Sequence, residues 1–201
     1  MKEEQDYIKD IAEIRSMMER SSKFLSLSDW AGILAGIYAL AGAWIAYNVL
    51  EFHPDKIFYI YPDLTDIILT ATGILFLSLV SALPDSRRKA LKNDKKAWNA
   101  TSRRLLTSMA VPLLTGGILI MLLISYGLLG LIAPLTLLFY GFALYNAGSY
   151  SIDEVRIMGF VQMTLGLLNV AFISYGLLFW AIGFGLVHIV YGIYMYFRFE
   201  R

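Results

Sequence analysis

The hexapeptide Ile-Ser-Tyr-Gly-Leu-Leu at residues 124–129 recurs letter for letter at residues 173–178. When the sequence is shifted against itself by 49 residues, Thr115–Leu129 aligns with Thr164–Leu178, and nine of the 15 positions are identical. Apolar helices share Leu and Ile through composition alone, so the Ser-Tyr-Gly run in register with a Thr and a Gly is the informative part. The repetition predicts two copies of a membrane hairpin.

The composition places the chain among membrane proteins. Of 201 residues 58% are hydrophobic, mean hydropathy is +0.60, and apolar runs of span length recur. The chain has no cysteine, which excludes disulfides, thiol catalysis and cysteine metal sites. The charged start of the chain lacks the apolar segment of a cleavable signal peptide, so we expect the first span to direct insertion.

The hydrophobic pattern predicts an all-α, polytopic helical bundle with six transmembrane helices. Pro84 is expected to end the second span, and a tight turn at Gly127 to join the third and fourth. A polar loop over 147–156 precedes the fifth. The predicted spans cover about residues 30–50, 67–83, 106–126, 128–146, 157–175 and 178–197.

The repeated hairpins, spans 3–4 and 5–6, predict an internal geometry. Spans 3 and 5 run in the same direction, so we expect parallel repeats related by an axis along the membrane normal. Both Ser-Tyr-Gly runs would then lie at the outer interface, with Tyr126 and Tyr175 as interfacial aromatic residues. Spans 1 and 2 show no alignment that would make them a third copy.

Residues 1–28 predict a cytoplasmic amphipathic helix ahead of a membrane domain at 29–201. Apolar residues recur at three- and four-residue steps between charged ones, at Ile8, Ile11, Ile14, Met18 and Leu25. Such a helix would lie on the membrane surface or on the protein's own loops. Alternatively it would bind a protein partner or a second copy, because Ile11, Ile14, Met18 and Leu25 fit an a/d seam.

The segment Ile11–Ser28, IAEIRSMMERSSKFLSLS, directly precedes the Gly/Ala-rich run LAGIYALAGAW. This arrangement resembles that of a group of uncharacterised small bacterial multi-pass membrane proteins, over the first quarter of the chain. The resemblance implies a multi-pass protein of the bacterial inner membrane. It carries no functional residues.

Residues 85–104 form the strongly basic segment. With six spans, sixteen of the seventeen Lys and Arg residues lie on one side of the membrane, and Lys56 lies on the other. The positive-inside rule then predicts that both termini are cytoplasmic. The basic residues would act as topogenic charges or bind anionic lipid headgroups; nucleic-acid binding is not expected, since no recognition module accompanies them. They are Arg87, Arg88, Lys89, Lys92, Lys95, Lys96, Arg103 and Arg104.

The first span carries a ridge of small side chains at three- and four-residue spacing. Small residues let another helix approach closely in lipid, where packing drives association. The neighbour is expected to be a helix of the same chain, with a homo-oligomer as the alternative. The ridge consists of Ala31, Gly32, Ala35, Gly36, Ala39 and Ala43.

A polar face on the last hairpin is the candidate site within the membrane. Gln162, Gly166 and Asn169 share one face of the fifth span, and folding the sixth span back places His188 at the depth of Gly166. Gln162, Asn169 and His188 would line one small polar cavity, with His188 as the titrating group of a solute or proton site. Alternatively, they form interhelical hydrogen bonds that hold the bundle together.

The sequence predicts no catalytic residues, no cofactor and no metal site. Ser174 lacks the context of a hydrolase nucleophile, and His53 and His188 lie too far apart in depth to share a haem. The acidic outer loop shows no recognised metal-ligand spacing. We therefore expect a non-enzymatic protein, a scaffold or regulatory partner that presents its N-terminal helix and basic loop to the cytoplasm. The alternative is a small-solute channel or carrier using the polar face.

Overall fold

The computed structural model describes residues 29–61, 63–92 and 100–199. Within these residues the protein is all-helical and contains no strand, which confirms the all-α part of the predicted fold class. The amphipathic helix predicted for residues 1–28 lies outside the described residues.

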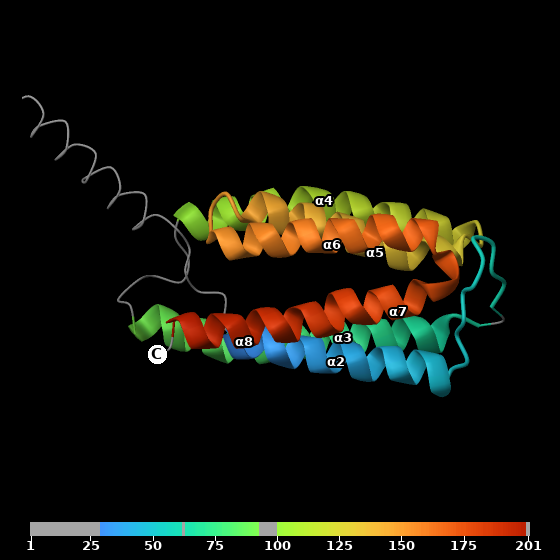
Figure 1. Cartoon of the computed structure of the whole chain (residues 1–201), viewed down its shortest axis with the longest axis horizontal. Coiled ribbons are helices and arrows are strands. Elements are labelled where there is room, and N and C mark those ends of the chain that lie inside the picture. Colours follow the sequence, from blue (N-terminus) through green and yellow to red (C-terminus); the bar gives the residue numbers. More distant parts are fainter. Residues whose placement is uncertain (1–28, 62, 93–99, 200–201) are drawn as a thin grey trace, which may run out of the picture.

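Six long helical rods run side by side along the longest axis of the described part of the chain (Figure 1). The last rod is continuous but contains a π-helical segment, η3, between two α-helical ones. The helices are α2 (Asp29–Asn48), α3 (Thr65–Lys92), α4 (Ala100–Ser125), α5 (Ile132–Ala147, preceded by the 3-10 turn η1, Leu129–Leu131), α6 (Asp153–Ala171), α7 (Gly176–Trp180, preceded by η2, Ile173–Tyr175), η3 (Ala181–Val187) and α8 (His188–Phe199).

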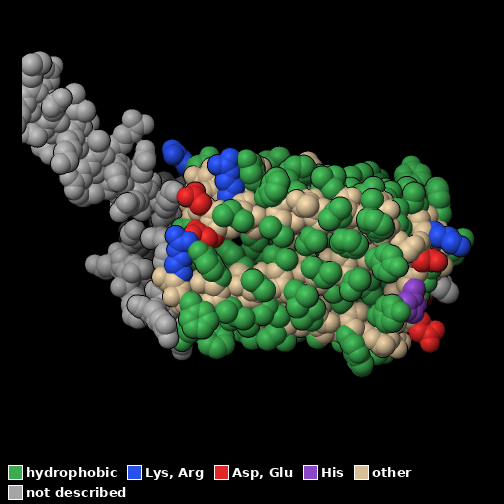
Figure 2. All heavy atoms as spheres, in the orientation of Figure 1, with side chains coloured by type: hydrophobic (Ala, Val, Ile, Leu, Met, Phe, Trp, Pro, Cys, Tyr) green, Lys and Arg blue, Asp and Glu red, His purple; other side chains and the backbone are tan. Residues whose placement is uncertain are grey.

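Four of the described helical stretches are long and apolar enough to cross a membrane: Trp30–Asn48, Ser102–Ser125, Leu129–Ala147 and Ile173–Arg198. Thr65–Ser81 of α3 is a shorter apolar helix. Hydrophobic side chains cover the middle of the visible face, and charged side chains gather at its two ends (Figure 2). An apolar belt between two charged ends is typical of a membrane-embedded bundle.

Two predicted helix boundaries are wrong. Helix α3 continues through Pro84 to Lys92, because a proline removes one backbone hydrogen bond without forbidding the helix, as Pro112 inside α4 also shows. Helix α6 begins at Asp153, four residues before the predicted span. Asp153 and Glu154 occupy its first turn, where negative charge interacts favourably with the helix N-terminus.

The helices form two layers of three. Helix α5 packs between α4 and α6 in one layer, and α2 packs between α3 and α8 in the other (Figure 1). The repeated hairpins therefore pack differently, since α4 lies against α5 whereas α6 and α8 belong to separate layers. The contact between the two layers is called the seam below.

Glycines set the close approach of α5 and α6. Gly141 of α5 faces Gly159 of α6, and Gly166, two helical turns further along α6, lies against the Pro134 carbonyl oxygen and Leu138 of α5. A Cβ added at Gly159 would lie 2.8 Å from the Gly141 carbonyl oxygen and 2.5 Å from the Tyr145 nitrogen. The two backbones are therefore in direct contact, as is common where small residues line a helix interface in lipid.

The small ridge of α2 packs inside the same chain. A Cβ on Gly36 would lie 2.6 Å from the Gly185 carbonyl oxygen of η3, and one on Gly32 would lie 3.6 Å from the Gly192 Cα of α8. Ala39 and Ala43 are buried on the same helix, and Ala31 and Ala35 are half-buried. The ridge predicted from the sequence thus packs against η3 and α8 of the same chain.

The loop of residues 49–64 closes one end of the bundle, called the loop end below. The backbone nitrogen of Tyr59 donates to the Gly127 carbonyl at 3.1 Å, and that of Gly130 donates to Ile57 at 3.2 Å. Gly127 has φ of +72°, the left-handed conformation that glycine adopts without steric cost. At the opposite end, called the terminal end, an ion pair between Arg198 of α8 and Glu154 of α6 joins the two layers.

Candidate functional site

A cluster of polar groups lies in the seam at the π-helical segment. We call Tyr140, Gln162, Gly183 and His188 the polar cluster; they come from α5, α6, η3 and α8. Gln162 Nε2 donates to the Gly183 carbonyl oxygen at 2.7 Å, and His188 Nδ1 lies 3.0 Å from the same oxygen. Tyr140 Oη lies 2.9 Å from His188 Nε2. The cluster therefore links both layers within the apolar part of the bundle.

The hydrogen bonds assign the tautomer of His188. A carbonyl oxygen only accepts, so Nδ1 must carry the proton that it donates to Gly183. Neutral His188 then accepts at Nε2 from the Tyr140 hydroxyl. The imidazole also stacks on the Tyr140 ring at 5.5 Å and on the Phe184 ring at 5.9 Å. Both ring nitrogens are thus held in place, and the Tyr140 and Phe184 rings, whose centroids are 5.0 Å apart, pack beside the imidazole.

The Gln162 side chain has a hydrogen-bond partner for its nitrogen but not for its oxygen. It is fully buried, and its Oε1 atom has no hydrogen-bond partner within the described residues. This oxygen lies against Gly183, because a Cβ added there would come within 2.6 Å of it. A buried acceptor without a donor is costly, so structural or functional reasons must retain it.

Asn169 does not join the polar cluster. It lies two helical turns from Gln162 toward the loop end, where Nδ2 donates to the Gly176 carbonyl oxygen at 3.3 Å and Oδ1 has no partner among the described groups. The structure thus brings Gln162 and His188 together on Gly183 and leaves Asn169 at the start of α7. All three are buried on the seam, and none of them lines either cavity described next.

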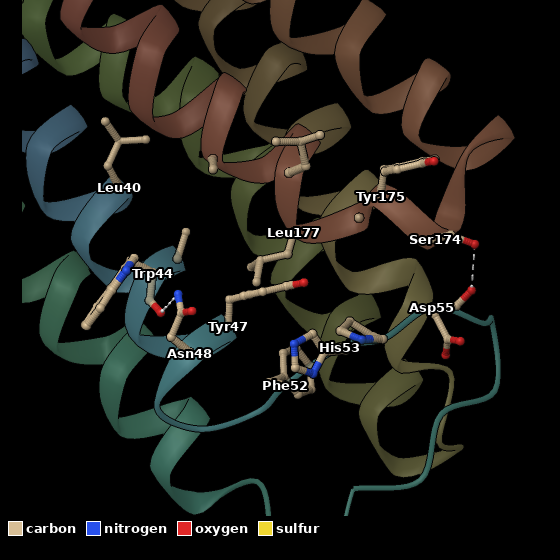
Figure 3. Close-up of a pocket in the computed structure, with 15 residues that line it drawn as sticks. Leu40, Trp44, Tyr47, Asn48, Phe52, His53, Asp55, Ser174, Tyr175 and Leu177 are labelled. Atoms are coloured by element: carbon tan, nitrogen blue, oxygen red, sulfur yellow. Dashed lines mark hydrogen bonds between the residues drawn. The ribbon is translucent and has the colours of Figure 1, made fainter.

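A cavity of about 620 Å³, the loop-end cavity, opens between α2, the loop and the start of α7 (Figure 3). Trp44 and Tyr47 of α2 and Tyr175 of η2 contribute aromatic rings to its lining, and His53 and Asp55 contribute polar groups from the loop. An apolar cavity of about 220 Å³ lies beside it between α2, α3 and α5. The two cavities share four lining residues, Ala43, Phe52, Pro54 and Leu177.

No metal site is found within the part of the chain that the structure describes, where no three His, Asp or Glu side chains converge on one point. His53 uses Nδ1 to bond the Glu51 carbonyl oxygen at 2.9 Å, and its ring meets the Tyr47 ring edge-on at 4.2 Å. Asp63 instead starts α3, because its carboxylate accepts a hydrogen bond from the Thr65 nitrogen at 2.8 Å. Among the acidic residues of the loop, Asp63 thus uses its carboxylate to cap α3 and does not point to a shared metal site.

The basic segment is described only in part. Arg103 and Arg104 lie exposed in the first turn of α4, at the terminal end. The backbone of Arg87, Arg88, Lys89 and Lys92 continues α3, and residues 93–99 lie outside the described residues. Binding of anionic lipids by this segment stays a prediction.

The sequence interpretation missed Tyr140, Gly183 and the π-helix. A signal was present, because Gly183 and Gly185 stand a few residues before the histidine of the last span, and π-segments often coincide with functional sites. Glycines within the fourth and fifth predicted spans, Gly141, Gly159 and Gly166, were a second signal, because they lie at the contact of α5 with α6. Helical spacing shows which residues share a face, but not which face of another helix they meet.

Comparison of the chain with protein-family models, with curated proteins and with solved structures finds no match. The resemblance of residues 11–28 to small bacterial membrane proteins therefore stays a prediction.

Proposed function

We propose that all six rods cross the bacterial inner membrane, with both termini in the cytoplasm. Helix α6 has 19 residues, so it is about 28 Å long and close to the thickness of the hydrocarbon core, like the four more apolar helices beside it. Lys56 is the only Lys or Arg at the loop end among the described residues, which supports a cytoplasmic terminal end. We further propose that α4–α5 and α6–α8 arose by duplication of one hairpin.

On this topology the protein is a non-enzymatic scaffold or regulatory partner. The observation that supports it is the distribution of charge along the sequence: with six spans, sixteen of the seventeen Lys and Arg residues would fall on the cytoplasmic side. The N-terminal segment and the basic segment would bind a cytoplasmic protein partner and anionic lipids there. The packed glycine interfaces of the membrane domain would hold these segments at the membrane surface.

Native mass spectrometry of the protein, extracted gently from its own cells, tests this function. We expect a stoichiometric protein companion that is lost when residues 2–24 are deleted. His188→Leu is the matched variant in the membrane domain and should keep the companion. Recovery of the full-length protein alone, or only as copies of itself, would contradict the scaffold function.

The polar seam favours a second candidate function, a carrier for a small neutral solute. Gln162 and Asn169 each present an unpartnered buried oxygen to the seam between two three-helix layers. A solute with hydrogen-bond donors would satisfy these oxygens, and rocking of one layer on the other would give alternating access. Charged solutes fit poorly, since Tyr140, Gln162 and His188 form a neutral cluster.

Stopped-flow light scattering of proteoliposomes, with urea and glycerol as probes, tests the carrier. We expect faster swelling than in protein-free liposomes of equal size, and loss of the difference in Gln162→Leu. Thr164→Val on the same helix is the matched control, because Thr164 is exposed and bonds only its own helix at Phe160. Equal swelling with and without protein would eliminate this candidate for both probes.

A further inference from the structure

We propose that the loop-end cavity binds an organic cation, an alkylammonium group carried on an apolar body. The cavity volume of about 620 Å³ is that of a small-molecule site. It lies where the helices end and the loop begins, so a ligand can have its polar group in the loop and its body among the helices (Figure 3). This inference does not depend on whether the protein acts as a scaffold or a carrier.

The charge of the site favours a cation. Asp55 lines the cavity, is exposed, and its carboxylate makes no hydrogen bond or ion pair within the described residues. Its backbone is fixed nonetheless, because the Asp55 carbonyl oxygen accepts a hydrogen bond from the Ser174 hydroxyl at 3.2 Å (Figure 3). The loop thus presents an unpaired negative charge at a defined place above the cavity.

Aromatic rings suit the same ligand. Tyr47 and Trp44 of α2 and Tyr175 of η2 contribute to the lining on both sides of the cavity. Tyr47 is held by the edge of the His53 ring at 4.2 Å. Rings beside a carboxylate are the usual recognition elements for substituted ammonium groups, because the electron-rich ring faces attract a cation.

The deeper lining suits an apolar body. Leu40, Leu177 and Ala181 line the cavity on the membrane side, below the polar residues of the loop. An alkyl chain in this position would be removed from water, which is the main contribution to binding of such a body. Two sources carry this chemistry: a free amphiphilic cation, and a lipid with an ethanolamine or choline headgroup.

Isothermal titration of the full-length protein in phosphatidylglycerol nanodiscs tests the site, with octyltrimethylammonium as the probe and octyl sulfate as the matched anion. We expect saturable binding of the cation and none of the anion. Asp55→Asn should weaken binding by about tenfold or more, and Tyr47→Leu by several-fold, since each removes one recognition element. Asp66→Asn is the matched control, because it removes a carboxylate at the same end that does not line the cavity.

The same titration in phosphatidylethanolamine nanodiscs separates the two sources. Phosphatidylglycerol is anionic and concentrates any cation at the bilayer surface, so the comparison uses the ratio of the wild-type affinity to the Asp55→Asn affinity in each nanodisc. A ratio that shrinks in phosphatidylethanolamine identifies competition by the lipid headgroup, and an unchanged ratio identifies a free cation. The proposal is overturned if the anion binds as well as the cation, or if Asp55→Asn and Tyr47→Leu both bind like Asp66→Asn. Asp55 has no side-chain partner to lose, so its variant should fold, and Tyr47→Leu gives an independent result.

Discussion

Gly159→Ala should separate α5 from α6 and destabilise the bundle. The added Cβ would lie 2.5 Å from the Tyr145 nitrogen and 2.8 Å from the Gly141 carbonyl oxygen. Contacts of this kind normally need about 3.5–4.0 Å, so the helices must move apart by roughly 1 Å. Neither obstacle is a side chain that can rotate away, because both belong to the α5 backbone.

The magnitude follows from two opposing terms. Overpacking of a tight interface costs about 1–3 kcal/mol, and replacing glycine by alanine inside a helix returns about 0.5–1 kcal/mol. The net loss of about 1–2 kcal/mol corresponds to a melting temperature lower by roughly 2–8 °C for a chain of this length. The midpoint would be measured by circular dichroism in one detergent at one heating rate.

Gly117→Ala is the matched control for this experiment. Gly117 lies inside α4, and a Cβ added there meets no atom within 4 Å. The control therefore carries the same change of helix propensity without the overlap, and its midpoint should stay unchanged or rise. A midpoint for Gly159→Ala equal to that of Gly117→Ala would refute the close packing of α5 on α6.

Three further measurements address the cluster, the loop and the topology. Tyr140→Phe keeps the ring stack but leaves His188 Nε2 without its hydrogen-bond donor, so the free energy of unfolding should fall by about 1 kcal/mol. Tyr126→Phe is the control, because Tyr126 is exposed. Equal thermal midpoints for the two variants would contradict the hydrogen bond. Hydrogen bonds from the Thr65 side chain and backbone lower the pKa of Asp63. The start of α3 should thus lose stability as the pH falls below about 3.9 and through the lowered pKa, and Asp63→Asn, measured in parallel by hydrogen exchange of α3, should lack this acid-sensitive step. A reporter fused after Arg201 should be active only in the cytoplasm, and activity only on the far side would reverse the proposed orientation.

The seam holds polar groups of two kinds, those that bond the two layers to each other and those that the proposed carrier would use. The His188 imidazole is held by Gly183 and Tyr140, which stabilises the contact between the layers. The oxygens that remain unpartnered, on Gln162 and Asn169, are not needed for that contact. Gln162→Leu removes both the Nε2 donor and the unpartnered oxygen, so the swelling assay measures whether Gln162 contributes to the passage of a solute.

The candidate site could be predicted from the sequence in part. Helical spacing predicted that Gln162 and Asn169 share a face, and folding back of the last span predicted His188 at a similar depth. The structure places Gln162 and His188 on one carbonyl group and Asn169 apart from them. Tyr140 could not be predicted as the partner of His188, because it comes from a different hairpin and faces the seam only when the two layers meet.

The sequence by itself determined that the chain is a helical membrane protein and where its apolar helices lie, to within a few residues. Insertion into lipid depends on the hydrophobicity of each segment taken alone, so the membrane-embedded segments can be predicted from the sequence. The small ridge of α2 was visible for the same reason, since spacing along one helix defines its faces.

Only the tertiary structure decided which helices pair. The two repeated segments are alike in sequence, yet α4 packs on α5 whereas α8 leaves α6 and packs on α2. Lipid is as apolar as a leucine side chain, so hydrophobicity does not select the neighbour of a membrane helix. The neighbour is selected instead by close approach of the two backbones, as at Gly159 against Gly141 and at Gly36 against Gly185. Such contacts depend on the shape of the helix surfaces in three dimensions.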